Sequence, residues 1–197
     1  GRGGHGAAPH LSIDPIVAGA QVISALQNIV SRNVDPLESA VVTATSMVGG
    51  EAFNVIPESV ELRGTIRTFK PEIRDMVLER FTEFATGVSS AMGCQAEVEL
   101  KSITPAVLND PVLSEQVYEV AKSVFPQAEI STVERTMGSE DMAFMMADIP
   151  GCYFFIGSAD HERGLDAGHH HPKFDFNEDA LTTGAALMAS VVLEFLK

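Results

Sequence analysis

The stretch that decides the fold of the first half of the chain runs Val60-Glu61-Leu62-Arg63-Gly64-Thr65-Ile66-Arg67. Its apolar residues and its glycine alternate with charged and hydroxyl-bearing residues, so one face is apolar and the other is polar. This period of two is typical of a strand that packs one face on a core and leaves the other in water. We therefore expect Leu62 and Ile66 to point inward and Arg63 and Arg67 to point outward.

Two helices flank this strand in the sequence. Asp14 and Pro15 favour a helix start, and apolar residues recur at helical spacing from there to about Ser31. A second helix with an apolar stripe is expected to begin at Pro71 and to end near Gly93, because glycine suits the left-handed position that follows a helix.

Alternation predicts two further strands, over residues 40–48 and 94–100, and the glycine-rich start of the chain reads as the end of another strand. Residues 1–102 are then ordered as strand end, helix, strand, strand, helix, strand. This order is the split βαβ, or ferredoxin-like, pattern, with a four-stranded antiparallel sheet and two helices on one face. Many binding modules share that fold, so it does not define a function.

Residues 103–197 have a different organisation, in which helices alternate with short apolar strands. Helices are predicted from Asp110 to about Phe125, from Ser139 through Ala147 and from about Glu178, with strands over 130–135 and 152–157. This order is α/β in style, but two short strands cannot complete a sheet. We therefore predict that residues 103–197 form one side of a larger α/β domain.

A histidine-rich stretch runs Gly168-His169-His170-His171-Pro172-Lys173-Phe174-Asp175-Phe176-Asn177-Glu178. Neutral imidazole is the commonest side-chain ligand of metal ions, and Pro172 stiffens the backbone that presents it. A polar surface loop is the alternative, because one ligand cluster cannot close a site that needs three or four ligands. From the residues alone, both interpretations stay open.

Composition limits the partners of the chain. The net charge of the 197 residues is −14, which argues against binding to nucleic acid or to an anionic membrane. No apolar run reaches the length of a membrane span, and no signal peptide is visible. Cys94 and Cys152 lie far apart and form no CxxC pair, which is typical of thiols in a reducing compartment, so we expect a cytoplasmic protein.

Five short motifs occur in order along the chain. They are Gly3-Gly4-His5-Gly6-Ala7-Ala8-Pro9-His10, Asn54-Val55-Ile56-Pro57-Glu58, Gly64-Thr65-Ile66-Arg67-Thr68-Phe69, Met137-Gly138-Ser139-Glu140-Asp141 and His170-His171-Pro172-Lys173-Phe174-Asp175-Phe176. Together they resemble the M20 metallopeptidase family, in the amidohydrolase branch that includes hippurate hydrolase and the indole-acetyl-amino-acid hydrolases. The resemblance covers essentially the whole chain.

The resemblance implies a catalytic α/β domain with two divalent metal ions and an inserted ferredoxin-like lid, often used for dimerisation. Residues 1–102 would be most of this lid, and residues 103–197 the C-terminal part of the catalytic domain. In the family, the N-terminal part supplies the remaining metal ligands and a glutamate general base, and we expect it to be missing from these residues. We also expect a homodimer that forms through the lid.

The same resemblance implies roles for four residues. His170 would be a metal ligand, and His5 would stabilise the oxyanion of the tetrahedral intermediate in the active site of the partner subunit. Asn54 and Arg67 would contact the substrate, and the planar fork of a guanidinium suits a carboxylate. Zinc, manganese, cobalt and nickel all accept imidazole and carboxylate ligands, so the residues do not name the metal.

The resemblance thus implies a metal-dependent amidohydrolase that cleaves the amide bond of small N-acyl amino acids, hippurate-like or aminoacylase- or carboxypeptidase-like, by attack of a metal-activated water. Glu140 and Asp141 lie in a family motif near the site and fit a helix-capping turn equally well. A non-catalytic dimerisation or binding module of ferredoxin-like fold is the alternative from another class.

Overall fold

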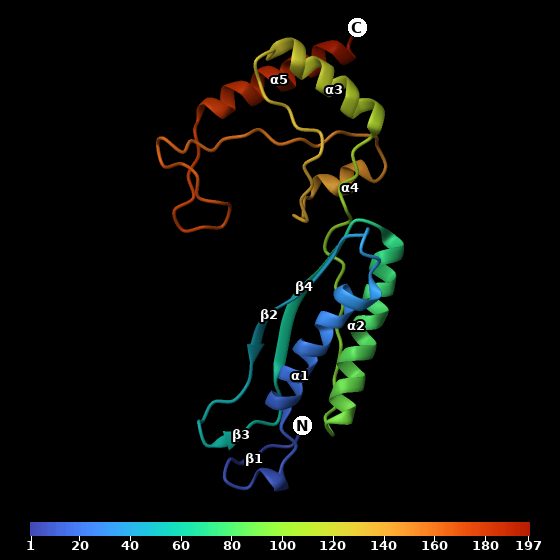
Figure 1. The fold of residues 1–197 in the computed structure, drawn as a ribbon, viewed down its shortest axis with the longest axis vertical. Helices are drawn as coiled ribbons and strands as arrows, with labels where there is room; N and C mark the ends of the chain where they lie inside the picture. Colours follow the sequence, from blue (N-terminus) through green and yellow to red (C-terminus); the bar gives the residue numbers. More distant parts are fainter. The chain divides into compact units, whose positions relative to one another are not determined.

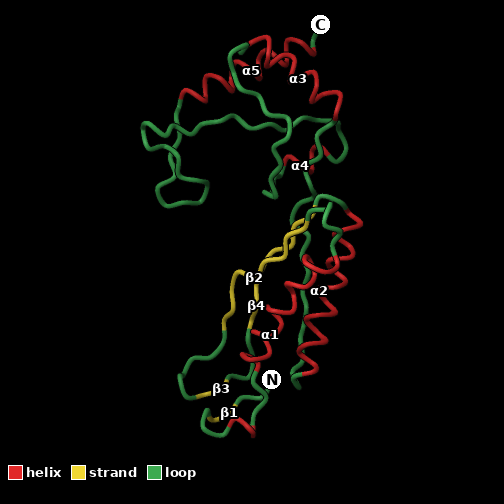
Figure 2. The backbone as a smooth tube through the Cα atoms, viewed as in Figure 1, coloured by secondary structure: helices red, strands yellow, loops and turns green.

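The computed structural model describes all residues 1–197 and divides into two compact units. The first unit comprises Gly1–Ala106 together with Met137–Ser139, and the second comprises Val107–Thr136 and Glu140–Lys197. Helices and strands are mixed in the first unit, whereas helices and loops make up the second (Figures 1 and 2). None of the helices combines the length and the apolar character that crossing a membrane requires.

The first unit is built on an antiparallel ladder between β2 (Ala40–Val48) and β4 (Glu61–Thr68). Leu62 and Ile66 of β4 pack against the hydrophobic core, while Arg63 between them is exposed. The inward positions of Leu62 and Ile66 and the outward position of Arg63 are thus confirmed, whereas Arg67, which was also expected to face water, is half-buried.

Helices α1 (Pro15–Asn28) and α2 (Pro71–Ala91) pack on one face of this ladder (Figure 1). The Asp14 carboxylate caps α1, since its Oδ1 accepts the Ile16 amide at 2.9 Å, as the sequence predicted. A short π-helical turn, η2 (Ile29–Asn33), extends α1. The core between these elements consists of buried apolar side chains, namely Val22, Leu26, Ile29, Val34, Val77 and Ala85.

The single four-stranded sheet that the sequence predicted does not form. The structure instead has two separate two-stranded sheets, β2 with β4 and the short β1 (Gly4–His5) with β3 (Val55–Ile56). Residues 94–100 form no ladder, although half-buried and exposed side chains alternate there and Val98 packs on the core. Alternating polarity determines which side chains face the core, whereas pairing depends on where the edge of a neighbouring strand lies.

The second unit contains α3 (Pro111–Val124), α4 (Met142–Met146) and α5 (Asp179–Phe195). The Asp110 carboxylate caps α3 by accepting the Leu113 amide at 2.9 Å, which confirms the predicted start of that helix. Helices α3 and α5 pack against each other, and the buried side chains of the unit are Val117, Ala121, Ala143 and Leu187.

The strands predicted over residues 130–135 and 152–157 are not formed. The backbone pairing within the second unit is limited to an isolated bridge between Asp160 and Leu165. An apolar run such as 152–157 becomes a buried strand only where other strands offer hydrogen-bonding edges, and no strand of this unit does so.

Candidate functional site

Strands β1 and β3 bring His5 and Asn54 together, although these residues are far apart in the sequence. His5 pairs with Val55 in the ladder, and the next amide, that of Gly6, donates to the Asn54 carbonyl oxygen at 2.8 Å. A Cβ atom on Gly6 would lie 3.0 Å from that oxygen. Glycine therefore permits a close approach of the two segments that a larger residue would hinder.

A backbone hydrogen bond determines the tautomer of His5. Its Nδ1 accepts the Ala7 amide at 3.0 Å. A neutral imidazole has one acceptor and one donor nitrogen, so this bond places the ring proton on Nε2. The side chain is exposed, and Nε2 has no acceptor within the chain. His5 thus presents an N–H donor to solvent, which suits hydrogen bonding to a ligand oxygen and not coordination of a metal through Nε2.

The Asn54 side chain is exposed at the same place and forms no hydrogen bond within the chain. Its neighbour Phe53 is fully exposed. Val55, which pairs with His5, and Leu11, which follows β1 in the sequence, are largely exposed as well. The β1–β3 end of the first unit therefore offers an imidazole N–H and a carboxamide next to apolar side chains.

Arg67 lies near the opposite end of β4, where it pairs with Val41. Its Nη1 donates to the Met137 carbonyl oxygen at 2.6 Å and to the Ser139 hydroxyl at 2.8 Å. The sequence predicted that Ser139 caps the following helix, but α4 begins only after Asp141, and the hydroxyl binds the guanidinium instead. No carboxylate lies within ion-pair distance of Arg67, so its positive charge is not neutralised.

The two ends of the first unit are well separated. Glu61 pairs with Val48 at the β3 end of the ladder, and β4 then runs to Arg67 at the other end (Figure 1). Six residues of strand span about 20 Å at roughly 3.3 Å per residue. Within one chain, Asn54 and Arg67 therefore do not meet around a single small substrate.

The three consecutive histidines differ in their surroundings. The Nδ1 of His171 accepts the Lys173 amide at 3.1 Å, and the His169 ring meets the Phe174 ring edge-on at 5.0 Å. His170 has a positive φ of 65°, an uncommon backbone conformation for a residue with a side chain, and its ring has no hydrogen-bond partner. Metal-bound histidines usually donate their other ring N–H, so an Nδ1 that accepts an amide hydrogen leaves His171 the wrong tautomer for coordination through Nε2.

The residues of this chain do not by themselves enclose a metal ion. The structure contains no group of three or more His, Cys, Asp or Glu side chains arranged to hold one. In the loop, the rings of His169 and His170 both lack a hydrogen-bond partner, but these imidazoles alone are an incomplete site.

Glu140 belongs to a hydrogen-bonded cluster in the second unit that the sequence did not reveal. The Asn109 side chain exchanges two hydrogen bonds, each 2.8 Å, with the backbone N–H and C=O of Tyr153. Burial of the phenol raises the pKa of Tyr153, and its hydrogen bond to the Glu140 carboxylate and the charge of Asp141 raise it further. Tyr153 is therefore a neutral donor, and Glu140 has a structural partner of its own.

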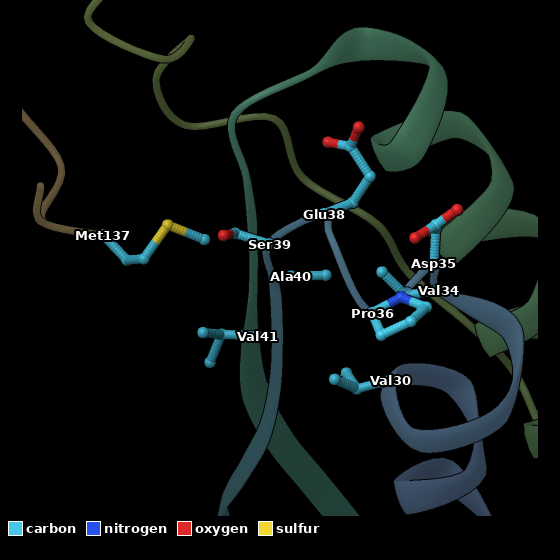
Figure 3. Close-up of a pocket in the computed structure, with 9 residues that line it drawn as sticks. All are labelled: Val30, Val34, Asp35, Pro36, Glu38, Ser39, Ala40, Val41 and Met137. Carbon is cyan, nitrogen blue, oxygen red and sulfur yellow. The ribbon is translucent and has the colours of Figure 1, made fainter.

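A hollow of about 440 Å³ lies in the first unit beside the end of β2 (Figure 3). Apolar side chains line most of it, including Val30, Val41 and Met137, with Asp35 and Glu38 as the acidic members. None of the four residues predicted for the site lines this hollow. The site is thus an exposed arrangement of groups and not a closed pocket.

The model of Peptidase family M20/M25/M40 matches residues 1–194, and the chain belongs to this family. Among its relatives, the chain is 38% identical over 200 residues to N-acetylcysteine deacetylase of Bacillus subtilis, a match that covers 100% of this chain and 51% of the relative. It is 37% identical over 201 residues to IAA-amino acid hydrolase ILR1-like 2 of Arabidopsis thaliana, covering 100% of this chain and 45% of the relative.

A similar solved structure is that of the Bacillus subtilis YXEP protein, described as a dinuclear metal binding peptidase from the M20 family. It superposes with a TM-score of 0.73 at 33% identity, over 93% of this chain and 47% of that one. The chain spans about half the length of the curated relatives it matches.

Proposed function

We propose that the complete protein hydrolyses the amide bond of small N-acyl amino acids. The observation that carries this proposal is the exposed His5 ring, which a backbone amide holds as an Nε2–H donor at the end of the first unit where the Asn54 carboxamide is also exposed and without a partner. Two such donors suit the carbonyl oxygen of an acyl group. The family match supports the same chemistry, since relatives at 37–38% identity are an N-acetylcysteine deacetylase and an IAA-amino acid hydrolase.

In this proposal, each of the chain's own residues has a separate task. The Nε2–H of His5 donates to the oxygen that becomes negative as the acyl carbon turns tetrahedral, which lowers the transition state more than the ground state. The Asn54 amide orients the substrate through a carbonyl or carboxylate oxygen. The unneutralised guanidinium of Arg67 binds the carboxylate of the amino-acid part.

The separation of about 20 Å between the β3 end and Arg67 favours a site shared by two copies of the chain. We propose that the first unit is the family's lid and that it forms a homodimer. His5 and Asn54 of one copy then serve the substrate whose carboxylate is held by Arg67 of the other. The exposed side chains of Leu11, Phe53 and Val55 give that end an apolar surface suited to burial against a partner.

We further propose that the complete protein holds two divalent metal ions, with His170 as one ligand and the remaining ligands outside residues 1–197. The YXEP description as dinuclear supports this part, and the ring of His170, like that of His169, has no hydrogen-bond partner. When bound, such ions would lower the pKa of a coordinated water. Metal analysis of the complete protein should show metal lost in His170→Ala and retained in His171→Ala, and equal losses would contradict the assignment.

The two cysteines support a cytoplasmic location, because Cys94 and Cys152 are both free thiols. A non-catalytic binding module of ferredoxin-like fold is the second candidate, which the substrate test separates from an enzyme.

The test is hydrolysis by the complete, metal-loaded protein of a panel of N-acetyl and N-benzoyl amino acids, with release of the free amine measured. We expect turnover of substrates that carry a free α-carboxylate and much slower turnover of the matching carboxamides. A protein that binds these compounds without cleaving any of them would support the binding module.

A further inference from the structure

We propose that Ser139 is a positioning residue for Arg67 and that the substrate carboxylate binds the Nε–Nη2 edge of the guanidinium. The inference rests on the proposed function, in which Arg67 binds the carboxylate of an N-acyl amino acid. It adds a specificity-determining residue to that site and states the side from which the anion approaches.

The contacts of Arg67 leave one edge of its guanidinium open. The group has five N–H donors, two of them on Nη1. These two have acceptors in the Met137 carbonyl at 2.6 Å and the Ser139 hydroxyl at 2.8 Å. Of the three remaining donors, the Nε–H and one Nη2–H lie in the guanidinium plane along one edge as a parallel pair, which is the geometry that a carboxylate accepts in two hydrogen bonds.

Arg63 shows this mode of binding on the same strand. Its Nε and Nη2 donate to the two oxygens of Glu61, each at 2.9 Å. The hydrogen bonds and the charge of that guanidinium hold the pKa of the Glu61 carboxyl below its usual value. Arg63 and Arg67 both belong to the outward-facing positions of β4, but only Arg63 has a carboxylate from its own chain. The corresponding edge of Arg67 is therefore available to an anion from outside.

The groups that hold Arg67 are neutral, and this matters for its function. A carbonyl and a hydroxyl fix the orientation of the guanidinium without cancelling its charge, so the full attraction for an anion is kept. An arginine side chain that is already held loses less conformational freedom when a ligand binds. In a chain with a net charge of −14, Arg67 is half-buried and is held without an acidic partner.

Of the two residues that accept hydrogen bonds from Arg67, Ser139 does so through its side chain, so a mutation can remove that contact. Met137 contributes a backbone oxygen that any residue at that position would supply. Ser139 contributes its hydroxyl, which Ser139→Ala removes and Ser139→Thr keeps. Arg63→Ala is the matched control, because it removes an arginine from the same strand that already has its carboxylate.

The experiment is a double-mutant cycle in the complete, metal-loaded protein. The wild type, Ser139→Ala, Arg67→Ala and the double variant are assayed on an N-acetyl amino acid and on its carboxamide. We expect Ser139→Ala to raise KM for the carboxylate substrate about tenfold with little change in kcat, the size of one hydrogen bond to a charged group. We expect no such change for the carboxamide, recovery in Ser139→Thr, and no further effect of Ser139→Ala once Arg67 is absent.

Two outcomes would overturn the positioning role. One is an equal effect of Ser139→Ala on both substrates, and the other is an equal effect with and without Arg67, since a purely structural serine would act in both backgrounds. The proposed function fails separately, if the wild type does not hydrolyse N-acyl amino acids or does not prefer the carboxylate. A structure of the complete protein with a bound substrate analogue gives a direct check, and a carboxylate on Nη1 would contradict the assigned edge.

Discussion

The two ends of the first unit differ in what they offer to a ligand. At the β1–β3 end, His5 and Asn54 present uncharged donors beside exposed apolar side chains. At the far end of β4, Arg67 presents a positive charge held by neutral groups. Uncharged donors suit a carbonyl or a developing oxyanion, whereas a guanidinium suits a carboxylate. In the proposed function, these groups complement the two halves of an N-acyl amino acid, and one chain keeps them about 20 Å apart.

The largest expected effect is at the uncharged end. His5→Ala in the complete enzyme should lower kcat by about 100–1000-fold with little change in KM, because the hydrogen bond strengthens mainly in the transition state. Steady-state kinetics measures this. His10→Ala is the control, since His10 lies in the adjacent turn η1 (Pro9–Leu11) and is exposed. A His5→Ala enzyme with near-normal kcat would remove the proposed role of the Nε2–H donor.

The charged end should respond to the charge of the substrate. Arg67→Ala should lower kcat/KM for an N-acyl amino acid. The loss should correspond to about 1.5–3 kcal/mol of transition-state binding free energy, the usual contribution of a hydrogen bond to a charged group. For the matching carboxamide the loss should be much smaller. Equal losses on both substrates, measured side by side, would show that Arg67 does not bind the carboxylate.

Mixing the two variants tests whether the ends act in one copy or in two. If His5 of one copy works with Arg67 of the other, a His5→Ala and Arg67→Ala heterodimer contains one intact site and one doubly defective site. Random exchange makes half of the dimers mixed, so about a quarter of the wild-type activity should return. Activity that stays at the level of the separate variants, with subunit exchange verified by mass, would place both groups in the same copy.

The smallest effect is expected at Arg63, which lies on the same strand as Arg67. Its partner Glu61 is exposed, and exposed ion pairs contribute little to stability. Arg63→Ala should leave kcat/KM within about twofold of the wild type on either substrate. A larger and substrate-dependent loss would mean that the charge of the whole strand face attracts the substrate, and the contrast between the two arginines would then be weaker.

The sequence by itself determined the local structure of the first unit. The alternation from Val60 to Arg67 fixed which side chains face the core, because successive side chains of a strand point to opposite faces. Asp14 and Asp110 predicted the helix starts correctly, since a carboxylate that accepts the first free amides acts over only a few residues. The five motifs also placed the chain in its family.

Only the tertiary structure decided which distant groups meet. Residues 94–100 have the pattern of a strand, but they join neither of the two-stranded sheets. The hydroxyl of Ser139 was expected to cap a helix, but it binds Arg67, a partner 72 residues away in sequence. The Ala7 amide determines which ring nitrogen of His5 carries the hydrogen. The ring of His170 has no hydrogen-bond partner, whereas the neighbouring histidines contact Lys173 and Phe174. Such contacts depend on how the whole chain packs, whereas periodicity and capping depend on adjacent residues.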